Sequence, residues 1–511
     1  MKKIAISLLA AFSLGLASCD MDKTPYDAIS DAEALKTVVD FKNMRVGLYS
    51  SLRGLNSGGY VTMSEFQIDN FNAVVGYSNS YGDMHRWQFN ANSGEFSSIY
   101  GSFISHIGRA NFIISNQAQA DTTKFEAADQ VAVKKIIGEA HFVRAFCIFQ
   151  VAQYFCQAYD PATAKNPNTG VSYSLEYAPT SDASKYPGRY TLEETYAQIA
   201  KDIEEAKARI NVPGETASAY ITNDVITAFE ARVALAKKDY ATAAAKAKSL
   251  IDGGNYALCA SADELVDMWH YDGGAEAIWQ LPVTSTNELP GQNGDNFLPY
   301  NDTSVPDYIP TGEFISLFQN NDNRINAYFI ADEITTTSGA SGYVYEFNKF
   351  PDESGLWEAV GKVEAGRFTS EPKVFRIAEM YLIAAEAYAQ LNDLQNASKY
   401  LNEFKMARYA GHEGTQYSSV SNVMQELKVE RRIEFAGEGV RLLDLKRWGE
   451  GVKRGEPQNM DFCLFPGSNV TTALSKSASD TRMTWPIPQS EMDANPQMKQ
   501  NPGYLFLIMI L

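Results

Sequence analysis

Cysteine and histidine are scarce in this chain, with five of each among 511 residues. The cysteines show no CxxC spacing and the histidines no HExxH pair, so neither a zinc site nor a disulfide framework is predicted. Cys147 and Cys156 lie nine positions apart in a strongly helical stretch. Their side chains should therefore project from opposite faces, about 13 Å apart along the axis, which excludes a bridge between them.

Catalytic and cofactor motifs are lacking as well. The chain has no GxSxG nucleophile motif, no glycine-rich dinucleotide loop and no EF-hand loop. Gly437-Glu438-Gly439 lacks the third glycine and the preceding strand of a dinucleotide loop and is better explained as a helix end. We therefore expect no enzyme activity and no cofactor, with a bound calcium ion as an open alternative.

Basic residues are too few to balance the acidic ones. Lys and Arg number 44 against 62 Asp and Glu, which gives a net charge of -18. Coulomb repulsion then opposes binding to nucleic acid and to bare anionic lipid. Long apolar runs are also absent beyond the first residues, because the apolar tail 505–511 is only seven residues long. That tail is expected to pack on the domain, and no segment is expected to span a membrane.

The front of the chain has the pattern of a bacterial lipoprotein signal. Lys2 and Lys3 precede an apolar run over 4–16, and small residues lead to Cys19. We expect residues 1–18 to be removed and Cys19 to carry a thioether-linked lipid, the membrane anchor that the acidic surface cannot supply. An ordinary secretory peptide with a chance cysteine is the alternative.

Helical periodicity dominates the rest, so the predicted fold class is mainly α. Two stretches, Ala231–Leu250 and Ala385–Phe404, align without a gap, each with an Ala-rich helix, a turn at Asp239 or Asp393, and a second helix. Small residues let two helices approach closely, as in tetratricopeptide hairpins. About 130 residues separate the two, so an insertion must split the repeats.

The expected organisation follows from these composition changes. Segments 55–96 and 256–371 are rich in Gly, Asn and aromatic residues with weak periodicity, which predicts loops and a few short strands, one near Ala277–Pro282. The expected parts are a removed signal (1–18), a helical N-terminal part with an aromatic loop at 55–96 (19–220), a helical hairpin (221–255), a loop-rich ligand-binding insertion (256–371) and a C-terminal part with the last hairpins (372–511).

Three blocks in the C-terminal half resemble the SusD/RagB family. They are Arg376–Tyr388, Glu430–Gly449 and Trp485–Tyr504, and the N-terminal half agrees more loosely through the lipobox and the helices near Arg109 and Tyr190. The resemblance implies an outer-membrane, surface-exposed lipoprotein of Bacteroidota that caps a SusC-like TonB-dependent transporter barrel and hands it glycans or, in some branches, peptides. It also implies a right-handed superhelix of tetratricopeptide-like hairpins with a loop-rich, irregular subdomain that carries the ligand site.

The block around Glu430 invites two interpretations. Glu430, Glu434 and Glu438 would share one side of a helix, while Arg431 and Arg441 could reach neighbouring helices. A carboxylate pair for glycoside hydrolysis is one interpretation, but carboxylate separation cannot be read from sequence. We favour a structural ion-pair network that fixes how the last hairpin docks.

Aromatic and amide residues cluster in both irregular segments, which suggests a carbohydrate site. A flat ring covers the apolar C–H face of a sugar, and Asn, Asp and Gln bind its hydroxyl rim. Trp87 is the first choice because its neighbours are polar, whereas Trp357 is a weaker candidate and Trp279 is expected in the core. The alternative role of such rings is to pin loops to the scaffold. The candidate ligand residues are Trp87, Tyr81, Tyr77, Asn79 and Asn90 in the first segment and Tyr300, Asn301, Asp302 and Tyr308 in the second.

These observations predict a surface lipoprotein that binds glycan non-covalently and delivers it to an outer-membrane transporter. The competing hypotheses are the same architecture binding peptides, a glycoside hydrolase on a helical scaffold, and a protein-interaction scaffold without a small ligand.

Overall fold

The computed structural model describes residues 34–301, 304–361, 367–463 and 474–504. The lipoprotein signal, Cys19, Asp302 and the apolar tail therefore lie outside the described residues. Among the helices that are described, none combines the length and apolar character that a membrane span needs.

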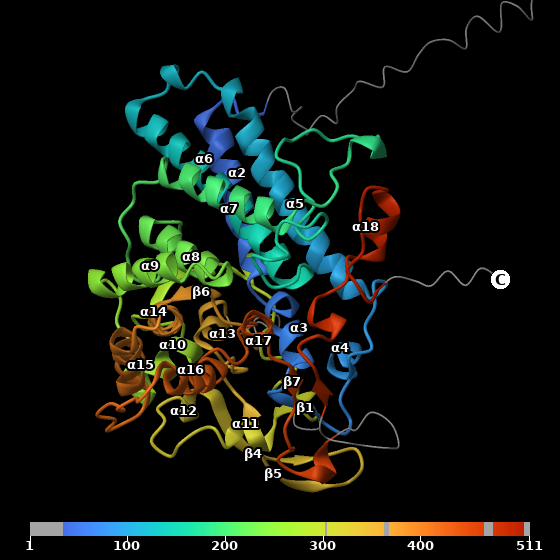
Figure 1. The fold of residues 1–511 in the computed structure, drawn as a ribbon, viewed down its shortest axis with the longest axis vertical. Helices are drawn as coiled ribbons and strands as arrows, with labels where there is room; N and C mark the ends of the chain where they lie inside the picture. The colour runs from blue at the N-terminus through green and yellow to red at the C-terminus, as the bar shows by residue number, and fades with distance from the viewer. Residues whose placement is uncertain (1–33, 302–303, 362–366, 464–473, 505–511) are drawn as a thin grey trace, which may run out of the picture.

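The N-terminal part is a layer of long helices, seen in the upper half of Figure 1. α6 (Ala127–Phe155) packs against both α5 (Gly94–Asn116) and α7 (Leu192–Lys207), and α2 (Val38–Leu55) packs against α5 and α6. From Ile136 onward α6 is buried on nearly all sides, which agrees with the many apolar residues of this stretch. A capping box opens α7, where the Thr191 hydroxyl accepts the Glu194 backbone N–H at 3.1 Å.

Both predicted hairpins are present. α8 (Asn223–Ala236) pairs with α9 (Tyr240–Gly253), and α14 (Ile377–Gln390) pairs with α15 (Leu394–Arg408). Asp239 and Asp393, the predicted turn residues, cap the second helix of each pair. α14 also packs on α9, so the two hairpins are neighbours in space although the insertion separates them in sequence.

Most of the remaining elements are short, and they lie mostly in the lower half of Figure 1. Each sheet among the described residues has two antiparallel strands, paired β1–β3, β2–β6, β4–β5 and β7–β8. The expected strand near residue 277 is β2, and Trp279 within it is fully buried, which confirms its place in the core. The bounds are β1 (Phe71–Ala73), β2 (Ala277–Gln280), β3 (Tyr308–Pro310), β4 (Phe329–Thr335), β5 (Ser341–Phe347), β6 (Lys373–Arg376), β7 (Val452–Lys453), β8 (Ser475–Lys476), α3 (Gly59–Gln67), α4 (Gly82–Arg86), α10 (Ala262–His270), α11 (Gly312–Ile315), α12 (Ile325–Tyr328), α13 (Gly355–Ala359), α16 (Val420–Glu434), α17 (Arg441–Trp448) and α18 (Gln489–Ala494).

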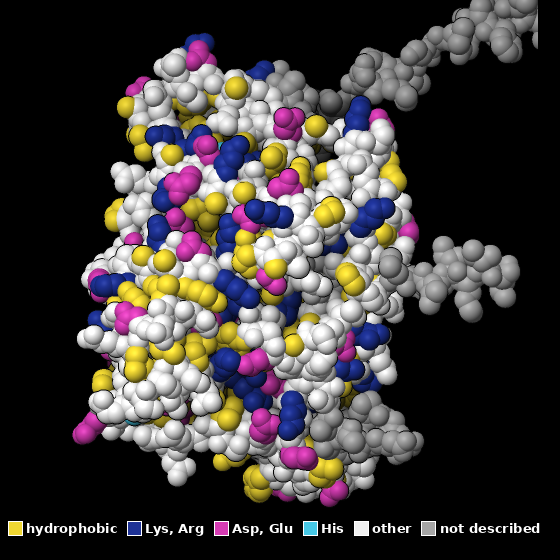
Figure 2. All heavy atoms as spheres, viewed as in Figure 1, with side chains coloured by type: hydrophobic (Ala, Val, Ile, Leu, Met, Phe, Trp, Pro, Cys, Tyr) yellow, Lys and Arg dark blue, Asp and Glu magenta, His cyan; other side chains and the backbone are white. Residues whose placement is uncertain are grey.

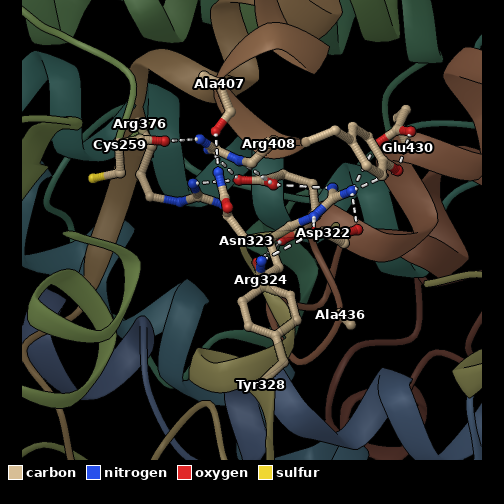
Figure 3. Close-up of polar contacts among 12 residues, drawn as sticks. Cys259, Asp322, Asn323, Arg324, Tyr328, Arg376, Ala407, Arg408, Glu430 and Ala436 are labelled. Carbon is tan, nitrogen blue, oxygen red and sulfur yellow. Dashed lines mark hydrogen bonds and ion pairs between the residues drawn. The ribbon is translucent and has the colours of Figure 1, made fainter. Parts of the chain in front are cut away.

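A buried ion-pair network joins the insertion to the C-terminal helices (Figure 3). Glu434, at the end of α16, accepts hydrogen bonds from Arg376 at 2.8 Å and from Arg408 at 2.9 Å. Glu276 in the insertion binds the same two guanidinium groups at 2.9 and 2.7 Å. All four side chains are buried, so these contacts fix the position of the insertion on the hairpins.

A second part of the network surrounds Arg324, which is fully buried. Its guanidinium donates to Asp322 at 2.7 Å and to Glu430 at 2.9 Å, and the Tyr409 hydroxyl donates to Glu430 at 2.5 Å. Because Glu430 and Glu434 are buried and bound to arginines, the structural interpretation of this block is confirmed. A polymer in solvent cannot reach these carboxylates.

Glu438 does not lie on the helix with Glu430 and Glu434, because α16 ends at Glu434 and the chain turns through Gly437 and Gly439, both at positive φ. The glycine pair is thus a helix end, as expected. Arg431 binds Asp444 of α17, and Arg441 binds Asp69, so both arginines do reach other elements.

The cysteines agree with the prediction for the described residues. Cys147, Cys156, Cys259 and Cys463 are all free and buried. Cys147 lies inside α6, and Cys156 caps its end.

Candidate ligand-binding site

Strand pairing brings the two aromatic segments together. β1 and β3 pair antiparallel, with Ala73 opposite Tyr308. Asp307 then holds the first segment, because its carboxylate accepts the Ser78 backbone N–H at 2.7 Å, the Ser78 hydroxyl at 2.8 Å and the Asn296 amide at 2.9 Å. The loop after β1 and the loop before β3 therefore form one surface.

A stack of three rings lies under this surface. Phe66 of α3 stacks with Tyr81 at a centroid distance of 5.1 Å and with Tyr308 at 4.3 Å. Two rings stacked on one face of Phe66 would overlap, so Phe66 separates them. Tyr308 is the fully buried end of the stack and Tyr81 the partly exposed end. Burial, together with the nearby carboxylate of Asp295, raises the pKa of Tyr81, which keeps its hydroxyl protonated.

Arg86 organises the polar groups beside Tyr81. Its guanidinium donates to the Tyr77 hydroxyl at 2.7 Å, to the Asn79 side-chain oxygen at 2.9 Å and to Asp83 at 2.9 Å. The Tyr77 hydroxyl also donates to Asn79. Burial lowers the pKa of Arg86, but its hydrogen bonds to Asp83 and Tyr77 outweigh this and raise it. Tyr77 and Asn79, both predicted ligand residues, thus form one ordered polar rim.

The backbone of this loop is strained in a way that favours a functional role. Asn79, Tyr81 and Trp87 adopt left-handed φ values of 68°, 52° and 58°. Asn adopts this conformation readily, but bulky residues such as Tyr81 and Trp87 rarely do, at a cost on the order of 1–3 kcal/mol each. Such strain concentrates at binding sites because the surrounding contacts must hold a particular side-chain arrangement.

Trp87 requires a correction. Its indole is 2% exposed, packs in the core and donates its N–H to the Gln67 carbonyl at 2.7 Å. The left-handed φ at Trp87 ends α4 and turns the ring inward despite polar neighbours. Tyr308 is likewise buried, with its hydroxyl bound to the Ser80 carbonyl at 2.6 Å. Neither ring is presented to a ligand, so for these two residues the expected direct contact is wrong and the loop-pinning role holds.

The other predicted residues occupy separate places. Asn90 is exposed, and its side-chain oxygen accepts the Asn92 N–H at 2.9 Å, which stabilises a local turn. Tyr300 is 45% exposed, with the Arg367 guanidinium 4.7 Å from its ring centre. Asn301 is exposed beside it. The half-buried Trp357 lies on α13.

Close backbone contacts connect the Tyr81 and Tyr300 regions. A methyl group at Gly59 would come within 2.5 Å of the Tyr81 hydroxyl, so α3 begins directly beside this ring. The preceding Gly58 donates its N–H to the Asn293 side chain at 2.6 Å, and Asn293 donates its own N–H to the Phe368 carbonyl at 2.9 Å. Phe368 in turn lies 6.5 Å from the Tyr300 ring.

Three residues that support the site were not predicted from the sequence. Phe66 backs Tyr81, Arg86 orders the rim, and Arg454 fixes the ends of α3 and α4. The Arg454 guanidinium is buried and donates to the carbonyls of Phe66, Ile68 and His85 at 3.1–3.2 Å. Burial lowers the pKa of Arg454 to about 10. Arg86 adjoins Trp87 in the aromatic segment and could have been found there, whereas Arg454 lies far away in sequence.

The arrangement offers stacking and directional hydrogen bonds. Among the described residues, no group of three or more His, Cys, Asp or Glu side chains has the geometry to hold a metal ion. The partly exposed ring of Tyr81 and the polar rim of Tyr77, Asn79 and Arg86 match a ligand with an apolar face and hydroxyl edges.

Comparison with known proteins agrees with this fold. The model of the SusD family matches residues 236–504, and a second family model, described as starch-binding associating with outer membrane, matches residues 22–235. A SusD-like protein of Formosa agariphila is 25% identical, with 98% of this chain and 99% of that protein covered.

Solved structures show the same architecture. A putative sugar binding protein from Bacteroides vulgatus is similar with a TM-score of 0.74 at 23% identity, covering 92% of this chain and 100% of that one. A SusD superfamily protein from Bacteroides thetaiotaomicron has a TM-score of 0.75 at 23% identity, covering 91% and 100%. These matches establish a tetratricopeptide-like helical fold, and the chain belongs to the SusD family.

Proposed function

We propose that this protein binds glycan non-covalently on the surface formed by the Tyr77–Tyr81 loop and the Tyr300 loop. The observation that carries the proposal is the partly exposed Tyr81 ring, held rigid from behind by Phe66 and flanked by the polar rim. A preordered ring loses little entropy on binding, so a shallow site can still retain a polymer. The family description as starch-binding and the sugar-binding relative support this ligand class.

The proposal includes delivery of the glycan to a SusC-like TonB-dependent transporter in the outer membrane. A lipid on Cys19 would tether the chain at the cell surface, and the description "associating with outer membrane" supports this location. Co-purification of the acylated full-length chain with a TonB-dependent barrel from native membranes, lost in Cys19→Ser, tests both the anchor and the partnership.

The ligand class is tested by titrating the purified mature protein with defined oligosaccharides and, separately, with defined peptide pools. Glycan binding without peptide binding is the expected result. Peptide binding alone would assign the same surface to peptide import. A reducing-sugar assay on the bound polysaccharide should show no time-dependent release, because the protein is proposed to hold glycan and not to cleave it.

A further inference from the structure

A cavity of about 140 Å³ lies at the centre of the molecule, where the long helices meet the C-terminal helices and the insertion. None of the predicted ligand residues lines it. At roughly 10–15 Å³ for each water, it has room for on the order of ten water molecules. This volume is comparable with the volume of one hexose molecule.

Several charged side chains line the cavity, and they are held in pairs. Arg232 of α8 donates to Glu379 of α14 at 2.7 and 2.6 Å. Arg431 donates to Asp444 of α17 at 2.7 and 2.9 Å. Figure 2 shows Lys and Arg side chains gathered with acidic ones across the middle of the face. A charged ligand would meet charges of its own sign here and displace existing pairs, whereas a neutral ligand would not.

The lining keeps hydrogen-bonding capacity after these pairs form. Among the described residues, Arg431 Nη1 is buried without a hydrogen-bond partner, and the half-buried Gln150 side chain also lines the cavity. Each carboxylate has about four lone-pair directions, and Glu379 uses two of them for Arg232. The cavity is therefore lined by both donors and acceptors, with the half-buried Tyr60 beside them.

Hydroxyl groups match this mixture because each can donate and accept. We propose that the central cavity is a second ligand site, which takes one neutral sugar unit of monosaccharide size. None of the residues proposed to bind glycan on the loop surface lines the cavity, so its failure would leave the proposed function untouched.

The test uses the purified mature protein carrying Tyr81→Ala, so that binding at the loop surface is reduced. Isothermal titration with glucose, galactose and N-acetylglucosamine measures neutral sugars, and glucuronate and glucosamine serve as charged comparators. Ala236 lines the cavity and is half-buried, so Ala236→Trp fills the space, while Ala236→Ser is the matched control. Gln150→Trp is a second filling variant from α6 and decides the outcome if Ala236→Trp does not fold.

We expect at least one neutral sugar to bind, with affinity falling about tenfold or more in the filling variants and staying within about twofold in Ala236→Ser. Three results would overturn the proposal: no neutral sugar binds, a charged comparator binds better than its neutral counterpart, or the filling variants bind as well as the control.

Discussion

Glu434 is the centre of the buried network, and replacing it by Gln should destabilise the protein by about 3 kcal/mol. The side chain is fully buried and binds Arg376 and Arg408. Burial opposes its ionisation, but these two arginines hold the pKa of Glu434 well below its usual range. Gln keeps the shape and removes the charge. Losing one partner of a buried pair costs about 3–5 kcal/mol, and the low end applies because Glu276 still binds both arginines.

Equilibrium urea unfolding at pH 7, followed by far-UV circular dichroism, measures this loss. Glu403→Gln is the matched control, because Glu403 is 39% exposed and 3.9 Å from Lys399, a surface pair worth less than about 1 kcal/mol. The lowered folded pKa means that the Glu434 contribution is present above the unfolded value of 4.5 and is lost as pH falls through the folded one. The gap between wild type and Glu434→Gln should therefore shrink in acid. Equal destabilisation by both variants at pH 7 would refute the reasoning.

Three further changes should separate structural from binding roles. Burial raises the pKa of Glu65 to about 7, so ionisation of this carboxyl lowers the stability of the folded protein as pH rises from 4.5 to 7. At pH 8 the free energy of unfolding of Glu65→Gln, measured with urea, should therefore exceed that of wild type by about 3 kcal/mol. Parallel stability profiles over pH would contradict this. Trp87→Phe loses the hydrogen bond to the Gln67 carbonyl, so it should lower the free energy of unfolding by about 1–3 kcal/mol and leave glycan affinity in titrations unchanged. A loss of glycan affinity would show that the indole contacts the ligand. In Gly291→Ala, the added methyl group would lie 2.8 Å from the Gly58 Cα atom. This overpacking should destabilise the protein by about 1–3 kcal/mol and lower its melting temperature. An unchanged melting temperature would show that the backbone shifts to make room for the methyl group.

The helical scaffold was largely predictable because its signals are local. Asp239 and Asp393 cap helices through contacts three residues away, and the Thr191 capping box is equally local. Glu438 shows the limit of local prediction. Its helical spacing from Glu430 predicted a place on the same helix, but the glycines on either side of Glu438 allow the left-handed turn that ends the helix.

The site was less predictable because long-range contacts build it. The two aromatic segments meet through β1 and β3, and more than 200 residues lie between these strands, so no local pattern shows the pairing. Polar neighbours made Trp87 look exposed, but its inward turn depends on the Gln67 carbonyl of another helix. Tyr81 is the stronger candidate because the ring of Phe66 supports it from behind, and this contact joins two separate elements.

The most direct test of the account is whether the exposed end of the ring stack holds the ligand. Oligosaccharide affinity should fall about tenfold or more in Tyr81→Ala, which removes the ring, and stay within about threefold in Tyr81→Phe, which keeps it. Tyr220→Ala is the matched control, since Tyr220 is 46% exposed and packs against Arg45 on the long N-terminal helices. Unchanged affinity in Tyr81→Ala, or an equal loss in Tyr220→Ala, would contradict the assignment of this surface to glycan binding.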